Sequence, residues 1–118
     1  MEKNKESNWQ KRLETIFEET LDKVLLNRKI KNKLNQEELK QFGVQDFDLL
    51  VPDVLKMIVE TNEVSTAKVQ GKFGLGYARA SRIIDQLEAC GFITEPNPEK
   101  SRKVLITLEE YKNIFEKE

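Results

Sequence analysis

Residues 65–91 read STAKVQGKFGLGYARASRIIDQLEACG, and this stretch decides the fold. Its opening hydroxyl residues Ser65-Thr66 suit the N-terminal cap of a helix, because a side-chain oxygen there accepts a hydrogen bond from a free backbone N–H. Gly74-Leu75-Gly76 supplies a tight turn, since glycine adopts backbone angles that other residues avoid. The apolar residues of 77–90 then recur at helical spacing, and Gly91 ends that second helix. Two helices joined by a glycine turn indicate a helix-turn-helix.

The flanking segments complete the order of a winged helix-turn-helix. Pro52 suits the first turn of an upstream helix whose apolar face continues to Thr61. Downstream, 92–94 and 104–107 are rich in β-branched and aromatic residues, so we expect two short strands that form a wing. Leu108 to Phe115 predicts a short C-terminal helix. The expected fold class is mainly α with α+β character: a winged helix-turn-helix over 48–107, a helical extension over 1–47 and a C-terminal helix over 108–118.

The N-terminal extension predicts one long helix and one short one. Ser7 and Gln10 have capping-box spacing, and a helix from Asn8 to Lys33 would be about 39 Å long, which exceeds the size of a 60-residue domain. A second helix is expected over Gln36 to Phe42. We therefore expect the long helix to dimerise the protein through an apolar stripe made of Trp9, Leu13, Ile16, Phe17, Leu21 and Val24. The alternative is that this helix lies across its own domain against Leu108, Tyr111 and Phe115.

The composition excludes most enzyme classes. The 118 residues contain no histidine and a single cysteine, Cys90. This rules out an intramolecular disulfide, a zinc site built on Cys/His sets and any triad that uses imidazole as its base. There is also no apolar run of about 20 residues and no secretory signal. We expect a cytoplasmic protein, located on nucleoid, plasmid or phage DNA, that is not an enzyme and needs no cofactor and no metal.

The net charge of the chain is −1, but the charge is unevenly distributed and one segment is basic. Residues 64–106 carry seven basic and four acidic side chains, whereas 48–63 carry one and four. On the helix 77–90, Arg79, Arg82 and Gln86 fall within a stripe of about 60° away from the apolar face. Arginine can hydrogen-bond to the edge of guanine and glutamine to that of adenine, so we predict that Arg79, Arg82 and Gln86 read bases. We include Ala78 in this base-readout set, because its small side chain leaves room for close approach to the groove. We expect phosphate contacts from Lys68, Lys72, Lys100, Ser101, Arg102 and Lys103. The alternative is an ordinary solvated helix face.

The same residues resemble the γ domain at the C-terminus of the bacterial DNA translocases FtsK and SpoIIIE. The resemblance covers 48–107 and is most specific over Gly76-Tyr77-Ala78-Arg79-Ala80-Ser81-Arg82-Ile83-Ile84-Asp85, with a wing that ends in Ser101-Arg102-Lys103-Val104. It implies a winged helix that recognises short DNA sequences and, in the translocases, also contacts a site-specific recombinase. Ala78 stands where many members have Asn, which leaves open a missing base contact or a different target. The motor's phosphate loop, GxxxxGK[ST], does not occur in the chain.

The leading hypothesis is therefore non-catalytic, sequence-specific binding of double-stranded DNA by a homodimer. It would suit partition, replication control or transcription. The alternative is a protein-interaction module that docks a recombinase or replication protein and contacts DNA only weakly. The modest local excess of +3 over 64–106 keeps this alternative open, because affinity for DNA depends strongly on the number of phosphates neutralised.

Overall fold

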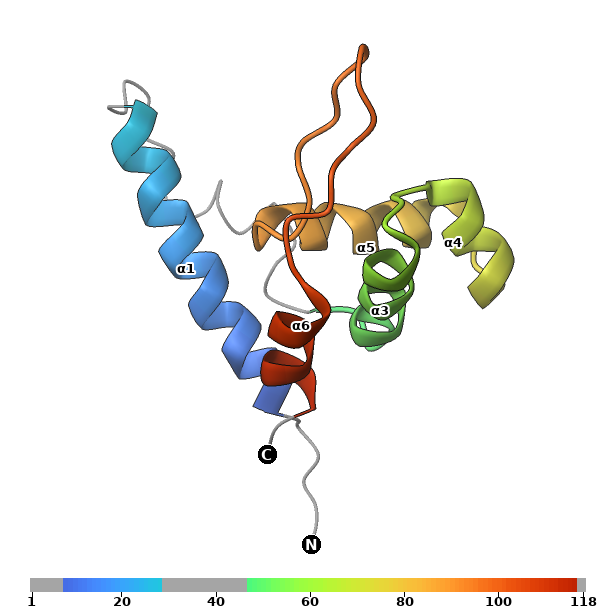
Figure 1. The fold of residues 1–118 in the computed structure, drawn as a ribbon, viewed down its shortest axis with the longest axis horizontal. Helices are drawn as coiled ribbons and strands as arrows, with labels where there is room; N and C mark the ends of the chain where they lie inside the picture. Colours follow the sequence, from blue (N-terminus) through green and yellow to red (C-terminus); the bar gives the residue numbers. More distant parts are fainter. Residues whose placement is uncertain (1–7, 29–46, 117–118) are drawn as a thin grey trace, which may run out of the picture.

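The computed structural model describes residues 8–28 and 47–116, and these form five helices (Figure 1). They are α1 (Asn8–Arg28), α3 (Val51–Thr61), α4 (Thr66–Phe73), α5 (Tyr77–Ala89) and α6 (Leu108–Phe115). The helices expected from the sequence are thus present between 47 and 116. Helix α1 begins at Asn8 as expected, whereas its predicted continuation to Lys33 and the helix over Gln36 to Phe42 lie outside the described residues. No described helix combines the length and the apolar character needed to cross a bilayer.

The helix-turn-helix is formed by α4 and α5, which pack against each other. Ser65 caps α4, and its side-chain oxygen accepts a hydrogen bond of 3.2 Å from the backbone N–H of Lys68. Gly74 ends α4 in the left-handed conformation, with φ of 66°, which only glycine adopts at little cost. The turn expected at Gly74-Leu75-Gly76 is therefore confirmed, and α5 starts directly after it.

The two wing strands are not formed as regular strands. Residues 92–106, called here the α5–α6 hairpin, run out from the body and back (Figure 1), with isolated antiparallel bridges at Ile93–Val104 and Asn97–Lys100. Near its base, the N–H of Leu105 donates to the carbonyl of Phe92 at 2.8 Å. Two prolines, Pro96 and Pro98, lie in one arm of this hairpin. Proline has no N–H to donate, so a continuous ladder is interrupted there.

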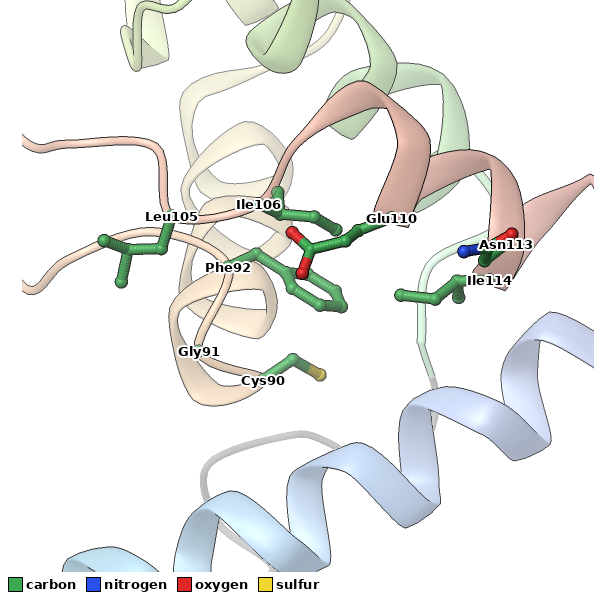
Figure 2. A pocket seen from close by; sticks show the side chains of 8 residues that line it. All are labelled: Cys90, Gly91, Phe92, Leu105, Ile106, Glu110, Asn113 and Ile114. Atoms are coloured by element: carbon green, nitrogen blue, oxygen red, sulfur yellow. The ribbon is translucent and has the colours of Figure 1, made fainter.

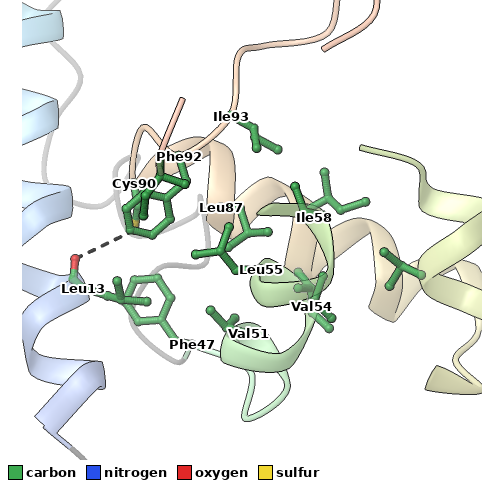
Figure 3. Packing of buried hydrophobic residues seen from close by; sticks show 14 of the residues in the cluster. Leu13, Phe47, Val51, Val54, Leu55, Ile58, Leu87, Cys90, Phe92 and Ile93 are labelled. Carbon is green, nitrogen blue, oxygen red and sulfur yellow. Dashed lines mark hydrogen bonds between the residues drawn. The ribbon is translucent and has the colours of Figure 1, made fainter. Parts of the chain in front are cut away.

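One apolar core joins all five described helices, and Figure 3 shows the part of it between α1, α3 and α5. The largest share comes from α3 and α5, whose buried faces have the spacing expected of amphipathic helices. Helix α1 contributes Leu13, which is fully buried, and α6 contributes Tyr111, whose hydroxyl donates to the carbonyl of Pro52 at 2.9 Å. The buried apolar residues are Leu13, Phe47, Val51, Val54, Leu55, Ile58, Val69, Ala80, Ile83, Ile84, Leu87, Cys90, Phe92, Ile93, Ile106 and Tyr111.

The first half of α1 packs on its own domain. Leu13 enters the core, Ile16 and Phe17 pack against it, and the rings of Trp9 and Phe115 are 5.8 Å apart. Within the predicted stripe Leu13 is fully buried, whereas Trp9, Ile16 and Phe17 are only partly buried against the core. Packing of this helix on its own domain is the alternative that the sequence offered. Dimerisation through this stripe stays a prediction. The side chains of Leu21 and Val24 lie outside the description.

Replacing Leu13 by alanine should lower the free energy of unfolding by about 2 to 5 kcal/mol, because a buried leucine is lost and its cavity remains. Urea denaturation followed by circular dichroism measures the change. Glu14→Ala is the matched control, since Glu14 is the exposed next residue of the same helix. Equal stability of Leu13→Ala and Glu14→Ala would show that α1 does not dock on the core.

Candidate nucleic-acid interface

The exposed face of α5 carries both arginines that were predicted to read bases. Arg79 and Arg82 are exposed, and Ala78 lies next to them on the same side of the helix, while Ala80, Ile83, Ile84 and Leu87 face the core. Asp85 is also exposed on this face, three residues after Arg82. Sequence reasoning did not include Asp85, although its spacing from Arg82 places it there. A carboxylate at this position repels phosphates but is able to accept a hydrogen bond from the amino group of cytosine.

Arg79 is held by a bidentate ion pair with Asp48. Its Nε donates to Oδ2 of Asp48 at 2.8 Å and its Nη2 donates to Oδ1 at 2.9 Å. Half of the Arg79 side chain remains exposed, whereas only 11% of the Asp48 side chain does. Two parallel bonds from one guanidinium fix its plane as well as its position. This contact thus holds the guanidinium of Arg79 in one orientation.

Gln86 does not belong to the exposed face, and its predicted role in base readout is wrong. The residue is fully buried, and its Oε1 accepts a hydrogen bond of 3.1 Å from the backbone N–H of Asp48. The helical stripe correctly groups Gln86 with Arg79 and Arg82, but the segment that leads into α3 crosses α5 at this point. A contact between residues 38 positions apart in the chain therefore removes Gln86 from solvent.

The carboxylate of Asp48 is stabilised in its charged form. The hydrogen bond from Arg79 lowers the pKa of Asp48 below its ordinary value of 3.8, and partial burial opposes this shift without cancelling it. The backbone N–H of Leu50 also donates to Oδ1 at 2.9 Å, which acts in the same direction as Arg79. The pKa of Arg79 is raised by the same pair. Both partners are therefore charged throughout the physiological pH range.

Exposed basic side chains lie near both ends of α5. Lys68 and Lys72 are on α4, which packs near the beginning of α5, and Lys100 and Lys103 are on the hairpin that follows its end (Figure 1). Lys68 is paired with Glu63 at 2.7 Å, a contact between two exposed groups that water screens. Ser101 is exposed between the hairpin lysines. These positions agree with the exposure that phosphate contacts require.

Arg102 is the exception among the predicted phosphate contacts. Its side chain is only 18% exposed, and its Nη2 lies 3.5 Å from Oε1 of Glu88 on α5. Burial raises the pKa of Glu88, and the charge of Arg102 offsets part of that shift. The predicted phosphate contact of Arg102 is less favoured than those of Lys100 and Lys103, because its side chain points back to α5. The pair connects the hairpin to the end of the helix.

A pocket of about 330 Å³ lies between the end of α5, the base of the hairpin and α6 (Figure 2). Its lining is mainly apolar, and burial raises the pKa of the Cys90 thiol to about 12. The thiol therefore stays protonated at neutral pH and is a poor nucleophile. Among residues 8–28 and 47–116 no group of three or more His, Cys, Asp and Glu side chains is placed to hold a metal ion. The pocket is lined by Cys90, Gly91, Phe92, Leu105, Ile106, Glu110, Asn113 and Ile114.

The helix-turn-helix lies within the part of the chain that a family model matches. Residues 45–107 match the model of the FtsK gamma domain, and the chain belongs to this family. A DNA translocase FtsK of Caldanaerobacter subterraneus is 37% identical over 89 residues, which are 75% of this chain and 12% of that protein. The DNA translocase SftA of Bacillus subtilis is 43% identical over 74 residues, which are 61% of this chain and 8% of that protein.

A third relative, a DNA translocase FtsK of Clostridium acetobutylicum, is 34% identical over 100 residues, or 77% of this chain. The chain spans between 8% and 13% of the length of these three relatives. The resemblance stated from residues 48–107 is confirmed.

The Asp48–Arg79 ion pair should make the stability of the folded chain depend on pH in the acid range. Because the pKa of Asp48 is lower in the folded chain than its ordinary value of 3.8, the stabilisation is complete above that pH and is lost as the pH falls through the folded-state pKa. Carboxyl ¹³C NMR titration should give Asp48 a midpoint below 3.8. In Arg79→Ala the midpoint should rise, since the donor of the two bonds is gone. A midpoint in the unaltered chain at or above the ordinary value would contradict the ion pair.

Proposed function

We propose that this chain binds double-stranded DNA with sequence specificity and without catalysis, by placing α5 in the major groove. One observation carries the proposal. The second helix of the helix-turn-helix presents two exposed arginines, Arg79 and Arg82, on one face. The FtsK gamma domain is a DNA-binding and sequence-recognition domain of DNA translocases, so the family supports the same activity.

The chemistry of α5 suits the readout of guanine. The major groove accepts a helix, and the forked guanidinium of arginine matches the O6 and N7 acceptors of guanine. Ala78 has no side chain beyond its Cβ and allows close approach of the helix to the base edges. In our proposal Arg79 and Arg82 contact bases, and Gln86 has no direct contact because it is buried.

The flanking basic residues would contact phosphates and set the position of α5. Lys68 and Lys72 do so from α4, and Lys100, Ser101 and Lys103 from the hairpin, which acts as the wing. A DNA-binding protein of this kind would suit partition, replication control or transcription.

Dimerisation of the chain stays a prediction. The intact chain is 13.8 kDa, so sedimentation distinguishes a monomer from a dimer directly, and Leu21→Glu with Val24→Glu tests the end of α1.

Arg82→Ala and Arg79→Ala should each weaken binding to a selected site by roughly 5- to 100-fold and relax the preference at one base pair, as the loss of a bidentate guanine contact does. Fluorescence anisotropy on the site and on single base-pair variants measures both effects. Lys56→Ala is the control, because Lys56 is an exposed cation on a different helix, α3. If both arginine variants keep full affinity and preference, α5 is not the reading helix.

Neutralising Lys100 and Lys103 together should weaken specific and non-specific duplexes alike. The slope of log affinity against log salt concentration should flatten by up to about 2, because two phosphate contacts are lost. The control is Lys56→Gln with Lys112→Gln, which removes the same charge from other exposed positions. A loss restricted to the selected site would make the hairpin a reader of bases rather than of phosphates.

A second function, docking of a protein, is favoured by the pocket. Leu105 lines it and is 55% exposed, and Leu108, three residues further along the chain, is 40% exposed. A recombinase or replication protein with an apolar side chain would cover these residues. Leu105→Ser separates the two functions: DNA affinity should not change, whereas binding to such a partner should fall.

A further inference from the structure

We propose that Asp48 is a positioning residue for base recognition, which holds Arg79 so that the free edge of its guanidinium faces a guanine in the major groove. The inference rests on the proposed function, because Arg79 meets a base only when α5 enters the groove. It adds a residue outside the helix-turn-helix to the determinants of specificity.

The two bonds to Asp48 leave the guanine-binding edge of Arg79 unused by this pair. A guanidinium has five N–H donors. Asp48 accepts from Nε and from one N–H of Nη2. One N–H of Nη1 and the second N–H of Nη2 remain side by side on the adjacent edge. This edge has the spacing of the guanine acceptors, and half of the side chain is open to solvent.

Asp48 is itself held in place from two sides. Its backbone N–H donates to the buried Oε1 of Gln86, and its Oδ1 accepts from the backbone N–H of Leu50. Gln86 and Arg79 belong to the same helix, so Asp48 is anchored to the element whose side chain it orients. An arginine without such a partner loses its rotamer freedom on binding, and a prearranged arginine has already lost it.

The charge of Asp48 gives the inference a distinct signature. A carboxylate near DNA repels phosphates, so its removal should not reduce non-specific affinity. Positioning of Arg79 affects only the base that Arg79 reads. The expected effect of removing Asp48 is therefore lost selectivity at one base pair with unchanged or slightly higher affinity for other DNA.

The experiment begins with a site selected from random duplexes by the intact chain, on which Arg79→Ala identifies the base pair that Arg79 reads. Asp48→Asn keeps an acceptor for the N–H of Leu50 but loses the charge. It should reduce the preference for guanine at that base pair by roughly 5- to 10-fold, while affinity for unrelated duplexes stays within about twofold. Asp53→Asn is the matched control. It removes the same charge from the first turn of α3 and leaves the Asp48–Arg79 pair in place.

A double-mutant cycle tests whether Asp48 acts through Arg79. In the Arg79→Ala background, Asp48→Asn should have no further effect on base preference, since the residue it positions is gone. Circular dichroism establishes that each variant is folded at the assay temperature. If the Asp48→Asn variant is not folded, Asp48→Ser is used in its place, because serine also offers an acceptor to the N–H of Leu50.

Three results would overturn the inference. In the first, Arg79→Ala loses the preference for guanine at its base pair but Asp48→Asn keeps it. This rejects the role of Asp48 and leaves DNA reading by α5 intact. Higher affinity and higher preference for the selected site would mean that Asp48 withholds Arg79 from DNA. No effect of Arg79→Ala on any duplex rejects the role of Arg79 in the proposed function, and the role of Asp48 with it.

Discussion

The hydrogen bond from the backbone N–H of Asp48 to the buried Oε1 of Gln86 connects the segment that leads into α3 to α5. A buried amide oxygen without a donor is costly, so the segment that leads into α3 lies across α5 at this point. That crossing places Phe47 in the core and sets the start of α3. It also brings the Asp48 carboxylate to Arg79. One polar contact thus connects the packing of the helices to the arrangement of the exposed face of α5.

The first half of the N-terminal helix packs on the same core as the other described helices. Leu13 is as deeply buried as the central residues of α3 and α5, and Trp9 contacts Phe115 on α6. The guanidinium of Arg12 donates to the carbonyl of Ile114 near the end of α6. Helices α1 and α6 therefore stabilise the helix-turn-helix by packing on the core that α3, α4 and α5 share.

Acidic partners offset part of the positive charge on the exposed surface. Two arginines and one aspartate lie on the exposed face of α5, and one of those arginines is already paired. Arg102 is also paired and faces inward. In the proposed complex, fewer free cations would reduce the affinity that does not depend on sequence and leave a larger share of the binding to base contacts.

The sequence by itself determined the helix-turn-helix, because local signals suffice there: the Ser65 cap, the glycines around Leu75 and the apolar periodicity of α5 all act over a few residues. It also predicted the bounds of α6 and the exposure of Arg79 and Arg82. Tertiary structure alone decided the burial of Gln86, the inward turn of Arg102 and the docking of Leu13. Each of these depends on a partner far away in the chain, and helical periodicity describes only the face a residue occupies, not which segment covers that face.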